Sequence, residues 1–206
     1  MKPYLLAFDA GTTSSRALVF DADTKKIGMG QFEFSQYFPQ PSWVEHDAEE
    51  IWSSQYKAIQ AALRAAKLKP EGISAIGITN QRETTIVWDA LTGEPIAPAL
   101  VWQDRRTSDF CESIRSGEHA NYIVETTGLI PDAYFSASKI RWILNKIEGA
   151  RERAERGELR FGTVDSWIVW KLTNGAKHIT DASNVSRTML YSIQDGAWDP
   201  VLCELF

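Results

Sequence analysis

The sequence predicts an α/β fold that opens with an antiparallel meander of three strands. Three apolar runs lie at residues 5–8, 16–20 and 28–34, and polar or glycine-rich turns separate them. Runs of this length between turns are typical of strands. Strands and helices then alternate, and the second half is mainly helical. The composition agrees, because 206 residues with 44% hydrophobic and 24% charged side chains suit a globular protein with one sizeable core.

The charge balance narrows the function classes. The chain has 22 Lys and Arg against 27 Asp and Glu, a net charge of −5. A surface that holds nucleic acid needs a clustered basic face, so no nucleic-acid partner is expected. Cys111 and Cys203 form neither a C-x-x-C pair nor a disulfide framework, which favours the cytoplasm. The apolar run at the N-terminus is too short for a signal peptide or a membrane segment.

The first half continues with one helix and two strands. Asp47 is a favourable N-cap, Glu49 and Glu50 suit the first turn, and apolar residues recur at helical spacing until Lys67. Residues 73–79 and 84–89 predict strands.

The second half predicts helices near residues 107–115, 121–126 and 138–147. A strand at 159–164 and a helix at 165–172, ended by Thr173-Asn174-Gly175, follow. Asp199-Pro200 then starts an amphipathic helix in which the sequence stops. We therefore expect a piece of a longer protein.

Several familiar motifs are absent. No G-x-x-x-x-G-K-[ST] occurs, and Gly28-Met29-Gly30 reaches Glu33 where a dinucleotide fingerprint needs a third glycine. The histidines are too scattered for an H-E-x-x-H zinc helix, and there is no G-x-S-x-G. These absences argue against P-loop, Rossmann, metalloprotease and α/β-hydrolase functions.

The segment Asp9-Ala10-Gly11-Thr12-Thr13-Ser14-Ser15-Arg16 lies between the first two strands. A tight turn at Gly11 exposes backbone N–H groups and surrounds them with four hydroxyls and a guanidinium, which suits a phosphate. Asp9 is placed to hold Mg²⁺ directly or through water. An ordinary hairpin with a polar turn is the equally weighted alternative.

A second constellation joins Arg82 and Glu83 with Trp102. The Arg-Glu pair follows a predicted buried strand, the place where α/β sheets hold ligands, and a donor fork beside an acceptor suits vicinal hydroxyls. Trp102 would supply an apolar wall. By pattern alone, a surface Arg-Glu pair is the commoner interpretation.

A third candidate is Tyr134, in a Pro-containing loop just before a predicted helix. Its hydroxyl could reach a ligand, while Phe135 suits the core. A half-buried packing role for Tyr134 is equally compatible with the spacing.

These segments together resemble the FGGY carbohydrate kinases, and within them the members that act on glycerol. The matching segments, in the family's order, are GTTSSR (11–16), WVEHD (43–47), GITNQRET (77–84), VWQ (101–103) with RRT (105–107), YFS (134–136) and SRTML (186–190). The resemblance implies an actin-like, ribonuclease-H-like domain over residues 1–206, with a mixed sheet flanked by helices. For the complete protein it also implies ATP-dependent phosphorylation of glycerol to glycerol 3-phosphate with Mg²⁺, and a homo-oligomer when full length.

The resemblance also implies roles for individual residues. Nucleotide phosphates are expected at Thr12, Thr13 and Ser14 with Arg16 nearby, the metal at Asp9, and glycerol at Arg82, Glu83, Trp102 and Tyr134. Ala10 replaces a larger residue common in the family, and Asp104 differs from other members and receives no role.

The family's catalytic aspartate belongs to a Gly-Asp-Gln segment that does not occur in these residues. We therefore expect the general base beyond Phe206, a missing second domain, and negligible phosphate transfer by this chain alone. Two alternatives stay open: a kinase for another sugar or polyol of the family, and a non-catalytic actin-like nucleotide-binding protein.

Overall fold

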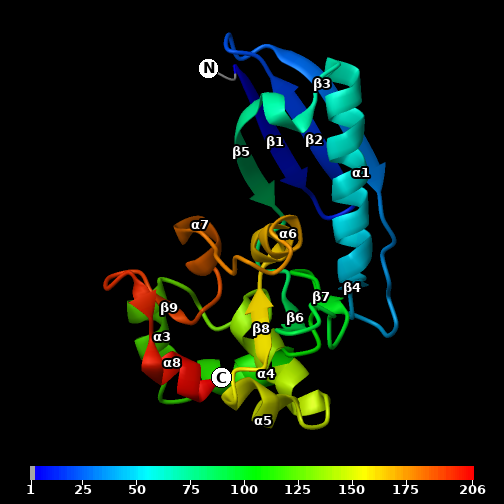
Figure 1. Cartoon of the computed structure of the whole chain (residues 1–206). Helices are drawn as coiled ribbons and strands as arrows, with labels where there is room; N and C mark the ends of the chain where they lie inside the picture. Colours follow the sequence, from blue (N-terminus) through cyan, green and yellow to red (C-terminus); the bar gives the residue numbers. More distant parts are fainter. Residues whose placement is uncertain (1–2) are drawn as a thin grey trace. The chain divides into compact units, whose positions relative to one another are not determined.

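The computed structural model describes residues 3–206, which form two compact units (Figure 1). Unit 1 comprises residues up to Gln36 together with His46–Gln81, and unit 2 comprises Tyr37–Glu45 together with Arg82–Phe206. No helix within residues 3–206 is long and apolar enough to cross a membrane.

Unit 1 is a four-stranded mixed sheet with the order β3-β2-β1-β5. Its strands are β1 (Tyr4–Ala10), β2 (Ser14–Phe20), β3 (Lys26–Glu33) and β5 (Ile73–Asn80). β1 and β2 pair antiparallel, as do β2 and β3, whereas β5 pairs with β1 in parallel. The predicted meander is confirmed, and β5 makes the sheet mixed.

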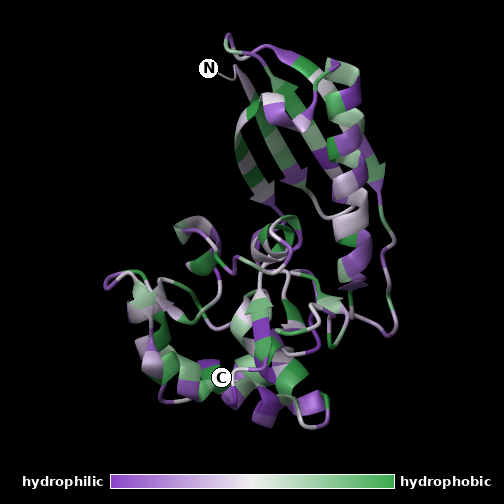
Figure 2. Cartoon of the chain, in the orientation of Figure 1, coloured by the Kyte–Doolittle hydropathy of each residue, from purple (hydrophilic) through white to green (hydrophobic). Residues whose placement is uncertain are grey.

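One face of this sheet is covered by helix α1 (Ala48–Ala66). The Asp47 side chain caps it by accepting the N–H groups of Glu49 and Glu50, as predicted, and Lys67 ends it in a left-handed conformation. The core between sheet and helix is built by alternate strand residues such as Phe8 and Val19, which are buried, as is Ile51 of α1. Apolar residues recur along these strands in Figure 2. A short 3₁₀ turn, η1 (Pro70–Gly72), precedes β5.

The glycines of β3 bring α1 close to the sheet. A Cβ atom at Gly28 would lie 2.3 Å from the carbonyl oxygen of Ala62, and one at Gly30 would lie 2.4 Å from that of Ala58. These backbone atoms cannot move aside without displacing the helix. The Gly-Met-Gly segment therefore serves helix–sheet packing.

Unit 2 combines short strands with helices. Its elements are β6 (Ile86–Asp89), β7 (Ala99–Leu100), α2 (Ser108–Arg115), α3 (Ala120–Thr127), α4 (Ser136–Lys146), α5 (Ala150–Glu155), β8 (Leu159–Gly162), α6 (Val164–Leu172), α7 (Ala182–Val185), β9 (Tyr191–Ser192), β10 (Ala197–Trp198) and α8 (Pro200–Leu205). The two-residue strand β4 (Glu45–His46) lies where the units divide. β6 pairs antiparallel with β8, and β9 with β10.

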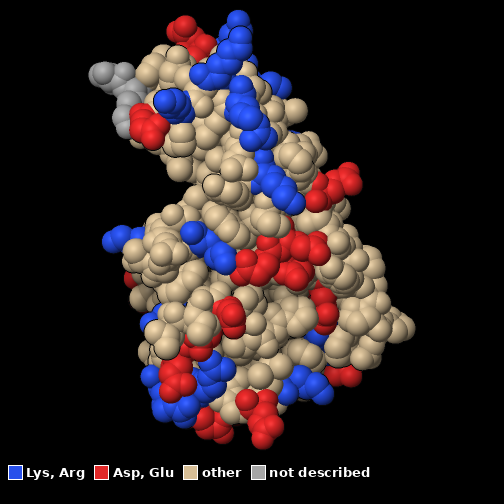
Figure 3. Space-filling model, turned by 45° about the vertical axis from the view of Figure 1, so that its right-hand side comes forward, with Lys and Arg blue, Asp and Glu red and all other residues tan. Residues whose placement is uncertain are grey.

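The core of unit 2 includes two apolar clusters. One is built around Ile143 of α4 with Val87 of β6 and Leu159 of β8. The other contains Phe135 and Met189. Phe135 is therefore a core residue, as predicted. Figure 3 shows Lys and Arg side chains near Asp and Glu side chains on the face in view. One ion pair of unit 2 joins Arg156 and Glu158 at 2.6 Å.

The predicted boundaries differ from the structure at a few places. The strand predicted from Thr84 begins at Ile86, because the Thr84 N–H donates to the Arg82 carbonyl at 2.8 Å and closes a turn. β5 and β6 follow each other in sequence but belong to different sheets. The short helix α7 and the β9–β10 hairpin had no counterpart in the sequence pattern.

We expect Gly30→Ala to destabilise the protein by about 1–3 kcal/mol, the usual cost of overpacking, because its methyl group would strike the Ala58 carbonyl. Gly77→Ala is the matched control in the same sheet, since a Cβ there meets nothing within 4 Å. Urea unfolding measures both. Equal stabilities of the two variants would show that the close approach does not constrain β3.

Candidate active site

The turn between β1 and β2 in unit 1 holds the residues predicted to bind phosphate. The Gly11 N–H donates to the Ser14 carbonyl at 3.0 Å, which closes the turn. A Cβ at Gly11 would lie 3.1 Å from that same carbonyl, a tight contact that favours glycine, and the φ of Gly11 is not in the left-handed region. Ser15 is buried, and its hydroxyl forms a hydrogen bond with the Ser54 hydroxyl of α1 at 2.8 Å. The turn therefore carries three hydroxyls near its tip, and the expectation of four is wrong.

Beside this turn, polar side chains form a row on the sheet face opposite α1. Asp9 and Arg16 are directly opposed in the β1–β2 register, and their side chains pair at 3.2 Å. Gln31 on β3 accepts from the Arg16 Nε at 3.2 Å and donates to the Ser14 hydroxyl at 3.0 Å. The row holds Arg16 and Ser14 beside each other without burying them, which leaves both accessible to an anion.

The same row contains one carboxylate suited to a divalent cation. Asp9 is 41% exposed, and residues 3–206 contain no cluster of three or more His, Cys, Asp or Glu side chains that could hold a metal. A single carboxylate is what Mg²⁺ uses when nucleotide phosphates and water supply its other ligands. Asp9 therefore fits a metal that arrives with a nucleotide, and does not fit a metal held by protein alone.

In unit 2, Glu83 adopts an unusual conformation after β5. Its φ is +64°, in the left-handed region, and its side chain is only 2% exposed. Its carbonyl accepts the Thr85 hydroxyl at 3.0 Å and the Ser136 hydroxyl at 3.2 Å. A non-glycine residue in this region costs energy and persists where neighbours fix it, which is common at functional sites.

The buried Glu83 carboxylate pairs with Arg187. Arg187 Nε donates to Glu83 Oε1 at 2.7 Å, across 104 positions of sequence. The Arg187 guanidinium carbon also lies 4.8 Å from the centre of the Phe135 ring and 5.7 Å from that of Tyr134. Arg187 was not among the predicted site residues, although its segment was among those that carried the resemblance.

Two aromatic residues complete this group. The rings of Trp102 and Tyr134 lie 5.5 Å apart, and both residues are half-buried. The backbone N–H of Trp102 donates to the Thr84 hydroxyl at 3.3 Å, which holds Trp102 beside the turn at Glu83. We call Glu83, Arg187, Trp102 and Tyr134 the Glu83 cluster. Arg82 precedes it directly in sequence and is exposed.

A buried ion pair supports the loop that carries Trp102. Asp104 is 1% exposed and accepts the Val44 N–H at 2.7 Å and the Arg106 side chain at 2.8 Å. Arg106 also pairs with Glu45 at 2.7 Å and lies 3.7 Å from the centre of the Trp43 ring. Asp104, which received no role from the sequence, joins the 101–106 loop to the Trp43 segment.

Lys139 supports the loop that carries Tyr134. It is fully buried in α4, and its Nζ donates to the carbonyls of Ala133, Tyr134 and Phe135. Burial lowers the pKa of the Lys139 amino group to about 7, although the carboxylates of Asp104 and Glu83 favour its charged form.

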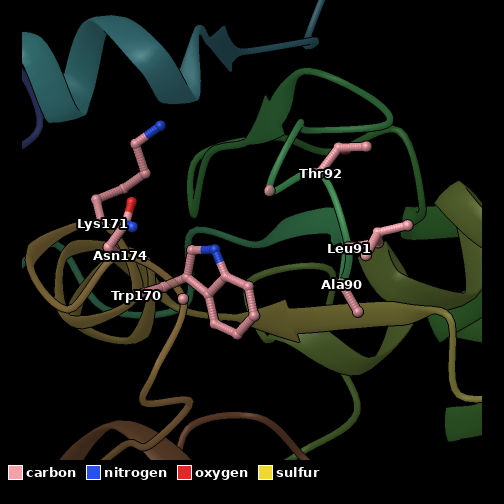
Figure 4. A pocket seen from close by; sticks show the side chains of 8 residues that line it. Ala90, Leu91, Thr92, Trp170, Lys171 and Asn174 are labelled. Atoms are coloured by element: carbon pink, nitrogen blue, oxygen red, sulfur yellow. The ribbon is translucent and has the colours of Figure 1, made fainter.

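A separate cavity of about 370 Å³ lies between residues 90–93 and the end of α6. Figure 4 shows the indole of Trp170 within it, with Asn174 on one side and Ala90 on the other. None of the predicted site residues lines it.

The structure thus brings Glu83, Trp102 and Tyr134 together in unit 2. It places Asp9, Thr12, Thr13, Ser14 and Arg16 together at one hairpin of unit 1.

Comparison with known proteins shows which family this chain belongs to. The N-terminal domain of the FGGY family of carbohydrate kinases matches residues 4–206. The chain belongs to this FGGY family. Among its relatives, the glycerol kinase of Deinococcus radiodurans is 57% identical over 202 residues, which cover 98% of this chain and 40% of that protein. That of Enterococcus casseliflavus is 56% identical over 204 residues, or 99% of this chain and 40% of that protein.

Solved FGGY structures have the same fold. A crystal structure of Plasmodium falciparum glycerol kinase with ADP has a TM-score of 0.91 and 31% identity, over 98% of this chain and 40% of that one. Xylulose kinase from Lactobacillus acidophilus has a TM-score of 0.84 at 19% identity, over 98% of this chain and 39% of that one, and it shows the fold alone. The predicted actin-like fold class is confirmed. The chain spans about 40% of the length of these relatives.

We expect the buried Lys139 to make stability depend on alkaline pH. The amino group has a pKa of about 7 in the folded protein and about 10.4 when unfolded, so the unfolded chain binds more protons between these values. The free energy of unfolding due to Lys139 therefore rises with pH across this window. The free energy of unfolding of the wild type minus that of Lys139→Met should therefore become more positive by about 1–3 kcal/mol from about pH 7 to pH 10.

Urea unfolding at several pH values measures this difference. Lys146→Met, at an exposed position of the same helix, is the control and should follow the wild type. A Lys139→Met curve parallel to the wild type would contradict the assignment.

Proposed function

We propose that this chain provides the glycerol-binding and phosphate-binding part of an ATP-dependent kinase that converts glycerol to glycerol 3-phosphate. The observation that carries this proposal is the Glu83 cluster, in which a buried, Arg-paired carboxylate lies beside a pair of aromatic rings. Relatives named glycerol kinase at 56–57% identity support glycerol over the other substrates of the family.

The Glu83 cluster has the chemistry to bind a small polyol. A carboxylate held by a guanidinium still has lone pairs for hydroxyl donors, and Arg82 supplies donors on the adjacent residue. The Trp102 and Tyr134 rings offer an apolar surface to the carbon chain, and Tyr134 adds a hydroxyl. Glycerol, which has three hydroxyls on three carbons, matches this combination of polar groups and apolar surface.

The hairpin turn supplies the complementary chemistry for ATP. Thr12, Thr13 and Ser14 offer hydroxyl and backbone donors to phosphate oxygens, and the Arg16 guanidinium offsets their charge. Mg²⁺, with Asp9 as a protein ligand, would neutralise charge on the phosphates. Phosphoryl transfer needs little covalent work from protein, so these residues contribute by orientation and electrostatics.

The proton acceptor for the attacking hydroxyl is proposed to come from outside these residues, since the family's Gly-Asp-Gln segment does not occur in them. A cytoplasmic location is proposed from the free thiols of Cys111 and Cys203. A homo-oligomer remains a prediction.

We expect Arg82→Ala to weaken glycerol binding by about 1.5–3 kcal/mol, the usual contribution of a hydrogen bond to a charged group. Arg156→Ala is a matched control, because Arg156 is exposed and pairs with Glu158 at 2.6 Å, away from the Glu83 cluster in sequence. Calorimetric titration of the 206-residue chain with glycerol, and with xylulose and gluconate as competitors, measures the effect.

Binding of xylulose or gluconate in preference to glycerol would move the proposal to another sugar kinase. Unchanged glycerol affinity in Arg82→Ala would remove Arg82 from the site. Absence of any polyol binding by a folded chain that binds ATP would favour the non-catalytic alternative.

A further inference from the structure

Unit 1 contains a chain of side-chain hydrogen bonds that ends at the phosphate turn. His46 Nε2 lies 2.8 Å from Gln36 Oε1, and His46 Nδ1 lies 3.4 Å from Gln81 Nε2. Gln36 Nε2 donates to the Thr12 carbonyl at 2.9 Å. His46 is completely buried and Gln81 is nearly so. We call Gln36, His46 and Gln81 the His46 relay.

The chemistry of the groups fixes the direction of the first two bonds of the relay, and a neutral imidazole fixes that of the third. The Thr12 carbonyl can only accept, so Gln36 must turn its amino group to it and its carbonyl oxygen to His46. His46 Nε2 must then carry a proton, which leaves Nδ1 to accept from the amino group of Gln81. The relay requires one neutral tautomer of the imidazole.

The surroundings of His46 favour this neutral form. Burial lowers the pKa of His46 to about 4, and the Glu50 carboxylate on α1 opposes this shift. That carboxylate also accepts the Ser35 N–H at 2.8 Å. The edge of the Phe34 ring packs against the imidazole at a centroid distance of 5.0 Å. Near neutral pH the ring can donate and accept at the same time.

One end of the relay contacts the phosphate turn, and the other directly precedes Arg82 and Glu83 in sequence. At one end is Thr12. At the other, the Gln81 N–H donates to the Ala10 carbonyl at 2.7 Å, and Gln81 is followed directly by Arg82 and Glu83.

The peptide that follows Thr12 transmits this geometry to the turn. In a trans peptide, the carbonyl of one residue and the N–H of the next point in opposite directions. When Gln36 holds the Thr12 carbonyl, the Thr13 N–H is directed away from Gln36. The Phe34 N–H holds the next carbonyl, that of Thr13, at 3.4 Å. The carbonyls of Thr12 and Thr13 are thus both held by residues of the segment that follows β3.

We propose that His46 is a positioning residue that acts through Gln36 on the Thr12–Thr13 peptide and so orients the Thr13 N–H to receive a nucleotide phosphate. This inference rests on the proposed function of the turn. It assigns a role to a buried histidine that touches neither the nucleotide nor the polyol.

The tautomer is tested first, without any ligand. Nitrogen-15 NMR of the 206-residue chain at about pH 7 should show a protonated Nε2 and an unprotonated Nδ1 at His46. A proton on Nδ1, or on both nitrogens, would overturn the relay whatever the turn binds.

The effect on binding is tested by titration with MgATP, followed through the backbone amide signal of Thr13. Gln36→Leu and His46→Phe should each weaken MgATP binding about five- to tenfold, the loss expected from one misplaced donor. His46→Gln should recover most of the affinity, because its amide can accept from Gln81 and donate to Gln36. Gln194→Leu is the matched control, since Gln194 also donates one bond to a backbone carbonyl, that of Glu125 at 3.0 Å.

The outcomes separate the relay from the function on which it rests. If the wild-type Thr13 signal responds to MgATP and Gln36→Leu binds equally well, the relay is wrong and the phosphate turn stands. If His46→Gln binds as weakly as His46→Phe, hydrogen-bond polarity is not what His46 supplies. If the wild-type Thr13 signal does not respond to MgATP, the phosphate assignment fails and the positioning role fails with it.

Discussion

The carboxylate of Glu83 is buried, and its residue holds a left-handed backbone conformation between β5 and β6. Both features cost free energy, because a buried charge loses its hydration and a Cβ crowds the backbone at positive φ. The protein offsets the first cost with the Arg187 guanidinium and the second with hydroxyl donors from Thr85 and Ser136. Two distant segments of unit 2, at Ser136 and at Arg187, are thereby tied to one turn.

This constraint explains why the surrounding loops are also fixed by buried charges. The Trp102 loop is held through Asp104 and Arg106, and the Tyr134 loop through Lys139. A cluster that is proposed to accept hydroxyls from a small, flexible ligand would gain affinity when its own side chains are ordered beforehand. Asp104, Arg106 and Lys139 thus order the two loops that carry the aromatic rings.

Much of the fold could be predicted because its determinants are local. Apolar runs between turns marked the β1–β2–β3 meander, and the Asp47 cap marked the start of α1. The tip of the hairpin could also be located, since glycine and hydroxyl residues follow a buried strand. Local pattern did not reveal that Ser15 faces α1, because that depends on strand register against a helix 39 residues away.

The part that could not be predicted is long-range. Arg187 lies 104 positions from Glu83, and nothing in the periodicity of either segment links them. Asp104 looked like a departure from the family, and only the position of Val44 and Arg106 shows what it binds. His46 was noted as one of several scattered histidines, and its use depends on two glutamines brought to it by different elements.

A double-mutant cycle of Glu83→Gln and Arg187→Met tests the Glu83 constraint most directly. The free energy of unfolding is measured by urea denaturation for the wild type, the two single variants and the double variant. Because the carboxylate is buried and directly bonded, we expect a coupling energy of at least about 1.5 kcal/mol, with each single variant losing more than the pair is worth. A coupling energy below about 0.5 kcal/mol, the level seen for independent sites, would show that Arg187 does not hold Glu83.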